Sequence, residues 1–143
     1  MDNKTRLHER PGFLIRRLHQ IHIALFAEEC ARYGITPVQY SVMTVLAEEP
    51  GLDQATVAER VGIDRVNATG VLARLERKRL LRRREDDADA RYKRCSLTPE
   101  GGDLVRRMRP AIARAHARTV SPLGRRDRAR FLRLLRGLVE AAR

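Results

Sequence analysis

The segment that most constrains the fold runs from Asp53 to Lys78, where two short amphipathic stretches follow each other closely. Asp53–Val61 and Asp64–Lys78 each begin with an Asp, whose carboxylate can accept hydrogen bonds from unpaired N–H groups of a first helical turn. Gly62 stands where the first helix must turn sharply, which often requires a positive φ. Apolar residues recur at spacings that close two crossed helices over a small core: Val57, Val61, Ile63, Ala68, Val71, Leu72 and Leu75. The pattern predicts a helix-turn-helix.

A basic stretch and a polar turn follow the second predicted helix. Seven of the eleven residues from Arg74 to Arg84 are Lys or Arg, residues 85–90 form a polar turn, and Arg91–Leu97 alternates like a strand. Two short strands around a polar loop predict a β-hairpin. A charge run is usually only solvated surface, but this one lies on elements that a helix-turn-helix presents to DNA. We therefore expect a mainly α fold with a β-hairpin wing, a winged helix-turn-helix that binds DNA.

Four motifs strengthen this interpretation because they occur in the order and at the spacing of a known family. They are Thr36-Pro37-Val38-Gln39-Tyr40, Ala58-Glu59-Arg60-Val61-Gly62-Ile63-Asp64-Arg65, Asp89-Ala90-Arg91 and Leu97-Thr98-Pro99-Glu100-Gly101. With them the chain resembles the MarR (multiple antibiotic resistance regulator) family of bacterial winged-helix transcription factors. The resemblance implies a homodimer whose recognition helices enter successive major grooves while wing arginines enter the minor groove. It also implies regulation by a small ligand bound between the dimerisation helices and the DNA-binding region.

The remaining sequence predicts helices on both sides of the DNA-binding region, within a single domain of residues 1–143. The broad apolar face from Gly12 to Tyr33 exceeds what one neighbouring helix needs, which suggests packing against the chain's own core and a second subunit. The last predicted helix, Arg125–Ala142, carries an apolar stripe that should not face water alone. We expect dimerisation helices at residues 11–34 and 99–143, and the winged helix-turn-helix at residues 36–98.

Two further expectations concern individual helices. Thr36 is a good N-cap, with Pro37 at the first helical position, for a helix that runs to about Glu48. That helix is expected to bury Val38, Val42, Val45 and Leu46. Pro110 lies inside the pattern of the helix that starts near Pro99, and it should bend or split that helix.

The DNA-reading residues follow from position and chemistry. Arg65, Asn67 and Thr69 lie in the half of the second helix that meets base edges, where Arg can bond guanine twice and Asn can do the same for adenine. Residues near the helix starts and on the basic stretch suit the DNA backbone, and in the family the wing Arg enters the minor groove with an Asp holding it. The expected set is Gln54, Thr56, Arg65, Asn67, Thr69, Arg74, Arg83, Asp89 and Arg91. The alternative is that Asn67, Thr69 and the Asp89–Arg91 pair are ordinary surface.

Two residues depart from the family pattern. Arg79 stands where the family usually has Gly between the recognition helix and the strand. A residue with a Cβ in a left-handed conformation is strained by about 1 kcal/mol or more, so the helix is expected to end differently here. Gly70 stands where a basic or polar residue is common, which weakens the helix and removes a groove contact.

An effector site is suggested by His19 and His22, polar groups one turn apart on an otherwise apolar helix side. The expected lining is Arg16, Arg17, His19, His22, Phe26, Tyr40 and Met43. The stretch Arg10–Arg17 resembles family members that regulate the breakdown of aromatic acids, which implies a small aromatic carboxylate as the effector. The alternatives are that the histidines pair across a dimer or with backbone, that His116 joins them around a metal, or that Cys30 senses redox state.

Composition agrees with a cytoplasmic DNA-binding regulator. The 143 residues carry a formal charge of +12, which points to a polyanionic partner. No segment resembles a membrane span or a signal peptide, and the two cysteines have no metal-like spacing. No catalytic constellation or phosphate-binding Gly loop appears, so we expect neither an enzyme nor a bound cofactor. The hypothesis is a homodimeric repressor released from a pseudo-palindromic operator by an aromatic acid; the remaining alternative is an architectural protein that coats DNA.

Overall fold

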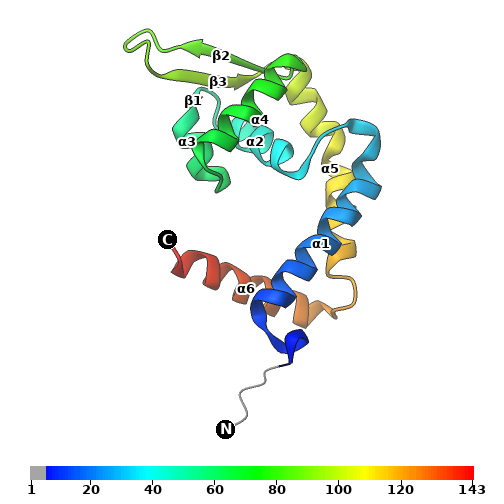
Figure 1. Cartoon of the computed structure of the whole chain (residues 1–143). Helices are drawn as coiled ribbons and strands as arrows, with labels where there is room; N and C mark the ends of the chain where they lie inside the picture. The colour runs from blue at the N-terminus through cyan, green and yellow to red at the C-terminus, as the bar shows by residue number, and fades with distance from the viewer. Residues whose placement is uncertain (1–5) are drawn as a thin grey trace. The chain divides into compact units, whose positions relative to one another are not determined.

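The computed structural model describes residues 6–143, which form helices and three short strands (Figure 1). The helices are α1 (Pro11–Cys30), α2 (Pro37–Glu48), α3 (Gln54–Val61), α4 (Arg65–Arg77), α5 (Pro99–Thr119) and α6 (Arg125–Ala141). The strands are β1 (Leu52–Asp53), β2 (Leu81–Glu85) and β3 (Lys93–Leu97), and 3-10 turns lie at Leu7–Glu9 and Ala31–Tyr33. The chain divides into two compact units. Unit 2 is Cys30–Ala111, and unit 1 holds the residues before and after it.

The helix-turn-helix lies in unit 2 and is built as its sequence predicts. The Asp53 carboxylate accepts a hydrogen bond from the Thr56 N–H at 2.8 Å, and Asp64 caps α4 through the Asn67 N–H at the same distance. Gly62 ends α3 with a φ of 80°. The core beneath includes Val42, Met43, Leu46, Val57, Ala68, Val71, Leu72, Leu75 and Leu81. The predicted helix-turn-helix is therefore confirmed, with Val61 and Ile63 half-buried at its rim.

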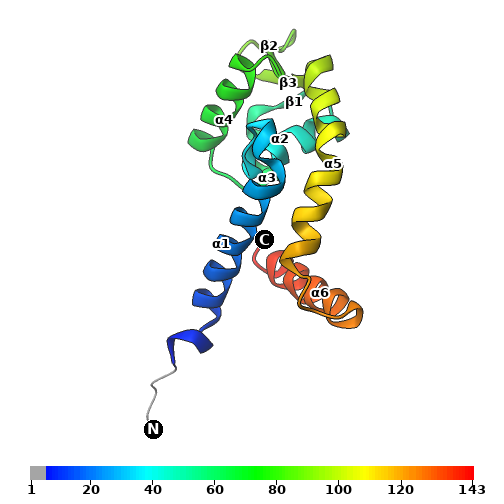
Figure 2. The same cartoon turned by 90° about the vertical axis from the view of Figure 1, so that its right-hand side faces the viewer.

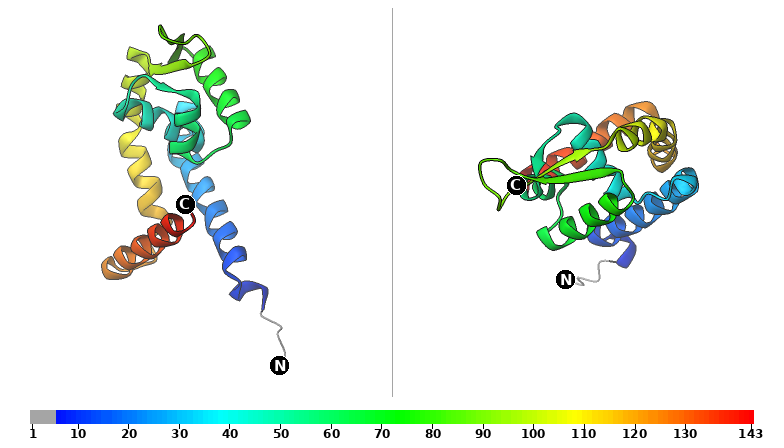
Figure 3. Two further views of the ribbon diagram at one scale, coloured as in Figure 1. Left: turned by 90° about the vertical axis from the view of Figure 1, so that its left-hand side faces the viewer. Right: turned by 90° about the horizontal axis from the view of Figure 1, so that it is seen from above.

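The wing is a three-stranded antiparallel sheet in the order β1-β3-β2. Leu81 pairs with Leu97 and Glu85 with Lys93, so β2 and β3 form the predicted hairpin. Its loop extends away from the helices of unit 2 (Figures 1 and 3). The sequence predicted only two strands. The third, β1, is two residues long and pairs Leu52 with Cys95, which is too short a segment for alternation to reveal.

The end of α4 differs from what the sequence predicted. Arg79 keeps the left-handed conformation with a φ of 60°, so the helix ends as a Gly-containing helix would. The surrounding contacts hold this conformation: the Thr98 hydroxyl donates to the Arg79 carbonyl at 2.7 Å, and the Thr98 N–H donates to the Leu80 carbonyl at 3.0 Å. The Leu80 N–H donates a hydrogen bond to the Leu75 carbonyl at 3.0 Å. These hydrogen bonds offset the strain that a side chain at residue 79 brings.

Unit 1 consists of α1 up to Glu29, the end of α5 from Ile112, and α6. Ion pairs from Arg114 and Arg118 to Glu29 join α5 to α1, and α6 turns back from the end of α5 (Figure 2). None of the residues of α6 is buried. Its apolar residues Leu132, Leu134, Leu138 and Val139 are all more than half exposed, as is Ile15 of α1. Within one chain, these helices leave the apolar faces that the sequence predicted largely uncovered.

Two helix expectations need correction. Of the two outcomes expected at Pro110, bending or splitting, the split does not occur: α5 runs without interruption from Pro99 to Thr119. Val38, in the first turn of α2, is 39% exposed, whereas Val42 and Leu46 are buried and Val45 is half-buried. In residues 6–143 no helix combines the length and the apolar character that crossing a membrane needs.

Candidate nucleic-acid interface

The N-terminal half of α4 presents polar side chains to solvent. Arg65, Asn67 and Thr69 are all exposed, as is Arg74 further along the helix. The Asn67 side-chain amide donates to the Asp64 carboxylate at 2.7 Å, which leaves its carbonyl oxygen as a further acceptor. The Thr69 hydroxyl donates to the Arg65 carbonyl at 2.9 Å, so its remaining hydrogen-bonding capacity is as an acceptor. This face carries the donors and acceptors that base edges require.

Three elements meet in a shallow groove of about 340 Å³ beside this face. Gln54 of α3, Arg65 and Thr69 of α4, and Arg91 of the wing all contribute to it, so the structure brings four predicted residues together. The lining is completed by Asp53, Ala55, Tyr92 and Lys93. Sequence reasoning missed Tyr92 and Lys93, although their place directly after Arg91 in a basic hairpin was a usable signal. Thr56 does not line the groove; it is half-buried, with its N–H bound to the Asp53 cap.

The wing tip holds a charged pair. Arg91 Nη2 donates to Asp89 Oδ2 at 2.8 Å, its Nε lies 3.1 Å from Oδ1, and the Arg91 backbone N–H also donates to Oδ1. These hydrogen bonds lower the pKa of Asp89 and raise that of Arg91, so the pair is fully ionised near neutrality. The Arg91 side chain is 86% exposed. Asp89 therefore fixes the direction of a guanidinium that projects beyond the protein surface.

Arg83 does not join this exposed set, although the sequence placed it among the DNA-binding residues. Its Nη2 donates to Glu76 Oε1 at 3.0 Å, its Nη1 donates to Gln54 Oε1 at 3.1 Å, and its side chain is only 16% exposed. These bonds lower the pKa of Glu76, whose carboxylate also accepts the Arg83 N–H. Arg83 faces inward because Leu81 is buried and β2 alternates sides, which leaves Arg82 and Arg84 on the outward side.

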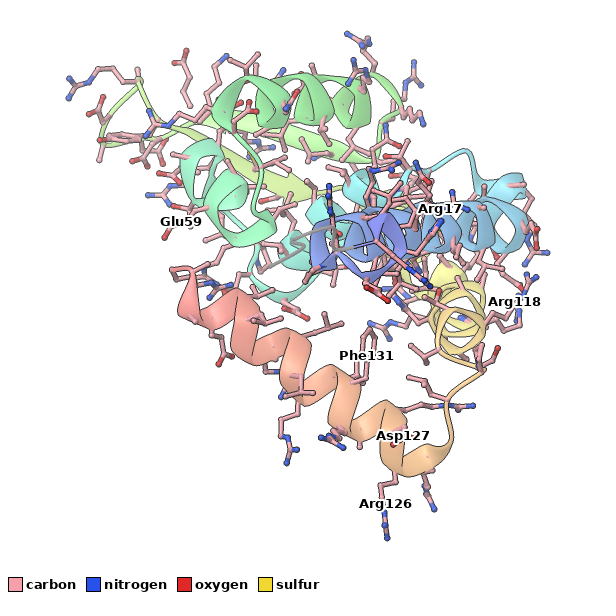
Figure 4. All side chains as sticks on the ribbon, turned by 60° about the horizontal axis from the view of Figure 1, so that its bottom comes forward. Arg17, Glu59, Arg118, Arg126, Asp127 and Phe131 are labelled. Carbon is pink, nitrogen blue, oxygen red and sulfur yellow. The ribbon has the colours of Figure 1, made fainter. Side chains whose placement is uncertain are left out.

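The histidines of the expected effector site lie in unit 1. His19 and His22 line an apolar pocket of about 710 Å³ between α1, α5 and α6, together with His116 and Phe131. Figure 4 shows Phe131 pointing from α6 toward the other two helices, while Arg126 points away. The remaining lining residues are Leu14, Ile15, Leu18, Ala117, Thr119, Val120, Leu132 and Leu135. Sequence reasoning named His116 only as a metal ligand and missed Phe131 in this role.

His22 is a polar group of this pocket with a hydrogen-bond partner and a ring contact. Its Nδ1 lies 2.8 Å from the Thr119 hydroxyl oxygen, and its ring stacks on His116 with 4.9 Å between centroids. Burial lowers the pKa of His22, and the neighbouring His116 and His19 lower it further. His22 is therefore held as the neutral imidazole at pH 7. The polar group that the sequence predicted to need a partner finds one in Thr119.

The other expected effector residues do not line this pocket. Arg16 and Arg17 are exposed on α1, where Arg16 lies over the Phe13 ring and Arg17 donates to Gln20. Phe26 is buried. Tyr40 and Met43 belong to α2 in unit 2, where Met43 is part of the core.

The metal and redox alternatives receive no support from the described residues. No group of three or more His, Cys, Asp or Glu in residues 6–143 is arranged to hold a metal ion. Cys30 is 2% exposed and Cys95 is fully buried, and burial raises the pKa of the Cys95 thiol to about 11. A buried thiol of this kind stays protonated and reacts slowly.

Comparisons with known proteins place this chain among regulators of one family. A sequence model described as MarR family matches residues 33–91. The chain is 30% identical over 110 residues to the homoprotocatechuate degradative operon repressor of Escherichia coli, covering 77% of this chain and 74% of that protein.

Two solved structures are similar to this chain along nearly their full length. The PcaV transcriptional regulator from Streptomyces coelicolor, in complex with its natural ligand, is 38% identical with a TM-score of 0.84, covering 97% of this chain and 98% of that one. BpsR of Bordetella bronchiseptica, whose DNA binding is regulated by 6-hydroxynicotinic acid, is 30% identical with a TM-score of 0.89, covering 94% and 96%.

Proposed function

This chain belongs to the MarR family of DNA-binding transcriptional regulators, and from that premise we propose that it is a homodimeric repressor released from a pseudo-palindromic operator by a small aromatic carboxylate. The observation that carries the DNA-binding mode is the groove where Gln54, Arg65, Thr69 and Arg91 meet. Membership in this family also makes the chain a regulator of transcription and not an enzyme.

The role of each residue on DNA follows from its exposure and its chemistry. Arg65, Asn67 and Thr69 on α4 read base edges in the major groove, while Arg74 holds phosphate. Arg91, aimed by Asp89, enters the neighbouring minor groove, where the negative potential attracts a guanidinium. Because the arginines meet the negative potential of DNA, affinity should fall as the salt concentration rises.

The dimer is proposed from the uncovered helices of unit 1. An amphipathic helix such as α6 with no buried residue is not stable in water by itself, since helix stability comes mainly from packing of the apolar face. A second copy supplies the same face in a two-fold arrangement. Two copies then place their recognition helices about 34–36 Å apart, one turn of DNA.

The DNA-binding assignment is tested by Arg91→Ala. Duplexes selected from a random library by the wild-type chain serve as the operator, and affinity is measured by fluorescence anisotropy at matched salt. Loss of a minor-groove contact should weaken binding by roughly tenfold and leave the dimer intact. Arg106→Ala, which removes an equal charge on α5, is the control. Equal affinity of wild type and Arg91→Ala would refute the wing assignment.

The effector assignment is supported by the aromatic-acid regulators that the chain resembles and by the apolar pocket with its three histidines. Aromatic rings suit the apolar lining, and histidine N–H groups of the pocket can donate hydrogen bonds to a carboxylate. Ligand binding favours a spacing of the two DNA-binding regions that fits the operator less well.

A panel of aromatic acids, including hydroxylated benzoates and nicotinates, should contain a ligand that raises the melting temperature by roughly 5 °C at about one hundred times its dissociation constant. His22→Ala should remove that rise while preserving affinity for the selected duplex. His8→Ala, outside the pocket, is the control. A full ligand response in His22→Ala would exclude His22 from the effector site.

A further inference from the structure

The inward face of β2 carries the hydrogen bonds that join the wing to the recognition helix. Arg83 donates to Glu76 of α4 twice, from its backbone N–H at 3.2 Å and from Nη2 at 3.0 Å, and its Nη1 reaches Gln54 of α3. Among the hydrogen bonds found in residues 6–143, those of Arg83 with Glu76 are the ones that tie a wing strand to α4. One side chain therefore contacts all three elements that surround the DNA-facing groove.

Arg83 is poorly placed to contact DNA while it makes these contacts. Each terminal nitrogen donates one N–H to a neighbouring side chain, the side chain is only 16% exposed, and Nε is buried without a hydrogen-bond partner among the described residues. A bidentate contact to phosphate or guanine needs two free N–H groups on one edge of the guanidinium. The neighbouring arginines Arg82 and Arg84 are exposed on the other side of the strand and have no such engagement with α4.

The geometry points to Arg83 as a positioning residue: we propose that the Arg83–Glu76 pair sets the wing against α4 so that Arg91 meets the minor groove when α4 lies in the major groove. This inference rests on the proposed operator binding. Glu76 is near the C-terminal end of α4, while Arg83 lies in the middle of β2. Arg91 lies in the turn that follows β2, so a rotation of the hairpin at Arg83 also moves Arg91.

Glu76→Gln separates this role from a phosphate contact by the sign of its effect. Removing a negative charge near DNA, and freeing an arginine for phosphate, should tighten binding if Arg83 were a DNA contact. If Arg83 positions the wing, Glu76→Gln loosens the wing and weakens binding to the selected duplex instead. Residues that share one ion-pair network couple strongly enough for an effect of about tenfold.

Two further readouts separate positioning from a loss of stability. Arg83→Gln should weaken binding to the selected duplex while leaving the salt slope and the affinity for a shuffled duplex unchanged, because no phosphate contact is lost. In an Arg91→Ala background, Arg83→Gln should have little additional effect on DNA affinity, because the side chain that Arg83 positions is already absent. Arg82→Gln, the same charge change on the outward face, is the control, and circular dichroism monitors the folding of each variant.

The outcomes are distinguishable from a failure of the proposed function. Wild-type chain that selects no duplex refutes operator binding itself. Wild-type chain that binds its duplex, combined with tighter binding by Glu76→Gln or a salt slope reduced by Arg83→Gln, would overturn the positioning role. Additive losses from Arg83→Gln and Arg91→Ala would overturn it as well.

Discussion

At the scale of single residues, the junction of α4, the wing and α5 depends on a close backbone approach. A Cβ built on Gly101 would lie 2.1 Å from the Leu80 carbonyl oxygen and 3.0 Å from its carbonyl carbon. The Gly101 N–H binds the Thr98 hydroxyl at 3.0 Å, which in turn holds the Arg79 carbonyl. The Thr-Pro-Glu-Gly motif after the wing thus packs the first turn of α5 against the residues that follow α4.

Gly101→Ala is expected to destabilise the chain by about 1–3 kcal/mol or more, because backbone atoms cannot yield as a flexible side chain would. Gly102→Ala, one residue on in the same helix, is the matched control: its Cβ would meet only Arg106 Nη1 at 3.7 Å. That control should be neutral or stabilising by roughly 0.5–1 kcal/mol. Urea unfolding measures both, and equal stability of the two variants would contradict the close approach at Leu80.

His22 predicts a pH dependence of stability. Its folded pKa lies below the ordinary value of 6.5, so the unfolded chain takes up the proton first as the pH falls. The contribution of His22 is fully present above pH 6.5 and is lost as the pH falls from 6.5 through the folded value. His22→Gln should therefore lose less stability than wild type between pH 7.5 and pH 5.5, in paired urea titrations. Parallel losses in the two proteins would show that His22 is not held neutral.

At the scale of elements, the sequence specified the helices and the hairpin wherever a local signal acts alone. Asp53 and Asp64 cap α3 and α4, and Thr36 forms a capping box with Gln39 at the start of α2. Gly62 and Gly34 adopt the left-handed conformation that ends their helices. Each of these signals depends on residues within one turn of the site, so each can be recognised without the fold.

The sequence predictions were incomplete where contacts between residues distant in the sequence determine the structure. The three arginines Arg82, Arg83 and Arg84 are chemically alike, so the sequence does not show what the middle one binds; Leu81 sets its side of the strand, and Glu76 and Gln54 on other elements accept its hydrogen bonds. Pro110 was expected to bend or split its helix, and the helix is not split. The expected effector residues were taken from two units, and the local pattern on α1 could identify His19 and His22 but not the α6 residues that face them.

The recognition helix carries an interior glycine whose effect is measurable. Gly70→Ala should stabilise the chain by about 0.5–1 kcal/mol, since the new Cβ would meet only Arg74 Nη1 at 3.5 Å. Gly137→Ala in α6, where nothing lies within 4 Å, is expected to give a similar gain and serves as the control for helix propensity. Thermal melting and affinity for the selected duplex are measured together. A loss of DNA affinity in Gly70→Ala alone would show that the DNA backbone approaches α4 at this residue.

At the scale of the whole molecule, the proposed function depends on a second copy. Leu138 is 68% exposed and Val139 is 59% exposed on α6. A charge placed at Leu138 in a buried interface would be desolvated without a partner. Leu138→Glu is therefore expected to shift the chain toward monomer in analytical ultracentrifugation and to reduce operator affinity together with it. Arg136→Glu, a charged substitution two residues away on the same helix, gives the comparison. A Leu138→Glu protein that remains fully dimeric would place the interface elsewhere.

The measurement that tests the account most directly is hydroxyl-radical footprinting of the wild-type chain on its selected duplex. The account predicts one short symmetric site, with protected segments repeating about every 10 bp where α4 of each subunit enters the major groove. Arg91→Ala should lose the protection of the adjoining minor groove and keep the rest. Protection that spreads along the entire duplex, or that covers a single half-site, would contradict a dimeric regulator reading DNA with α4 and the wing.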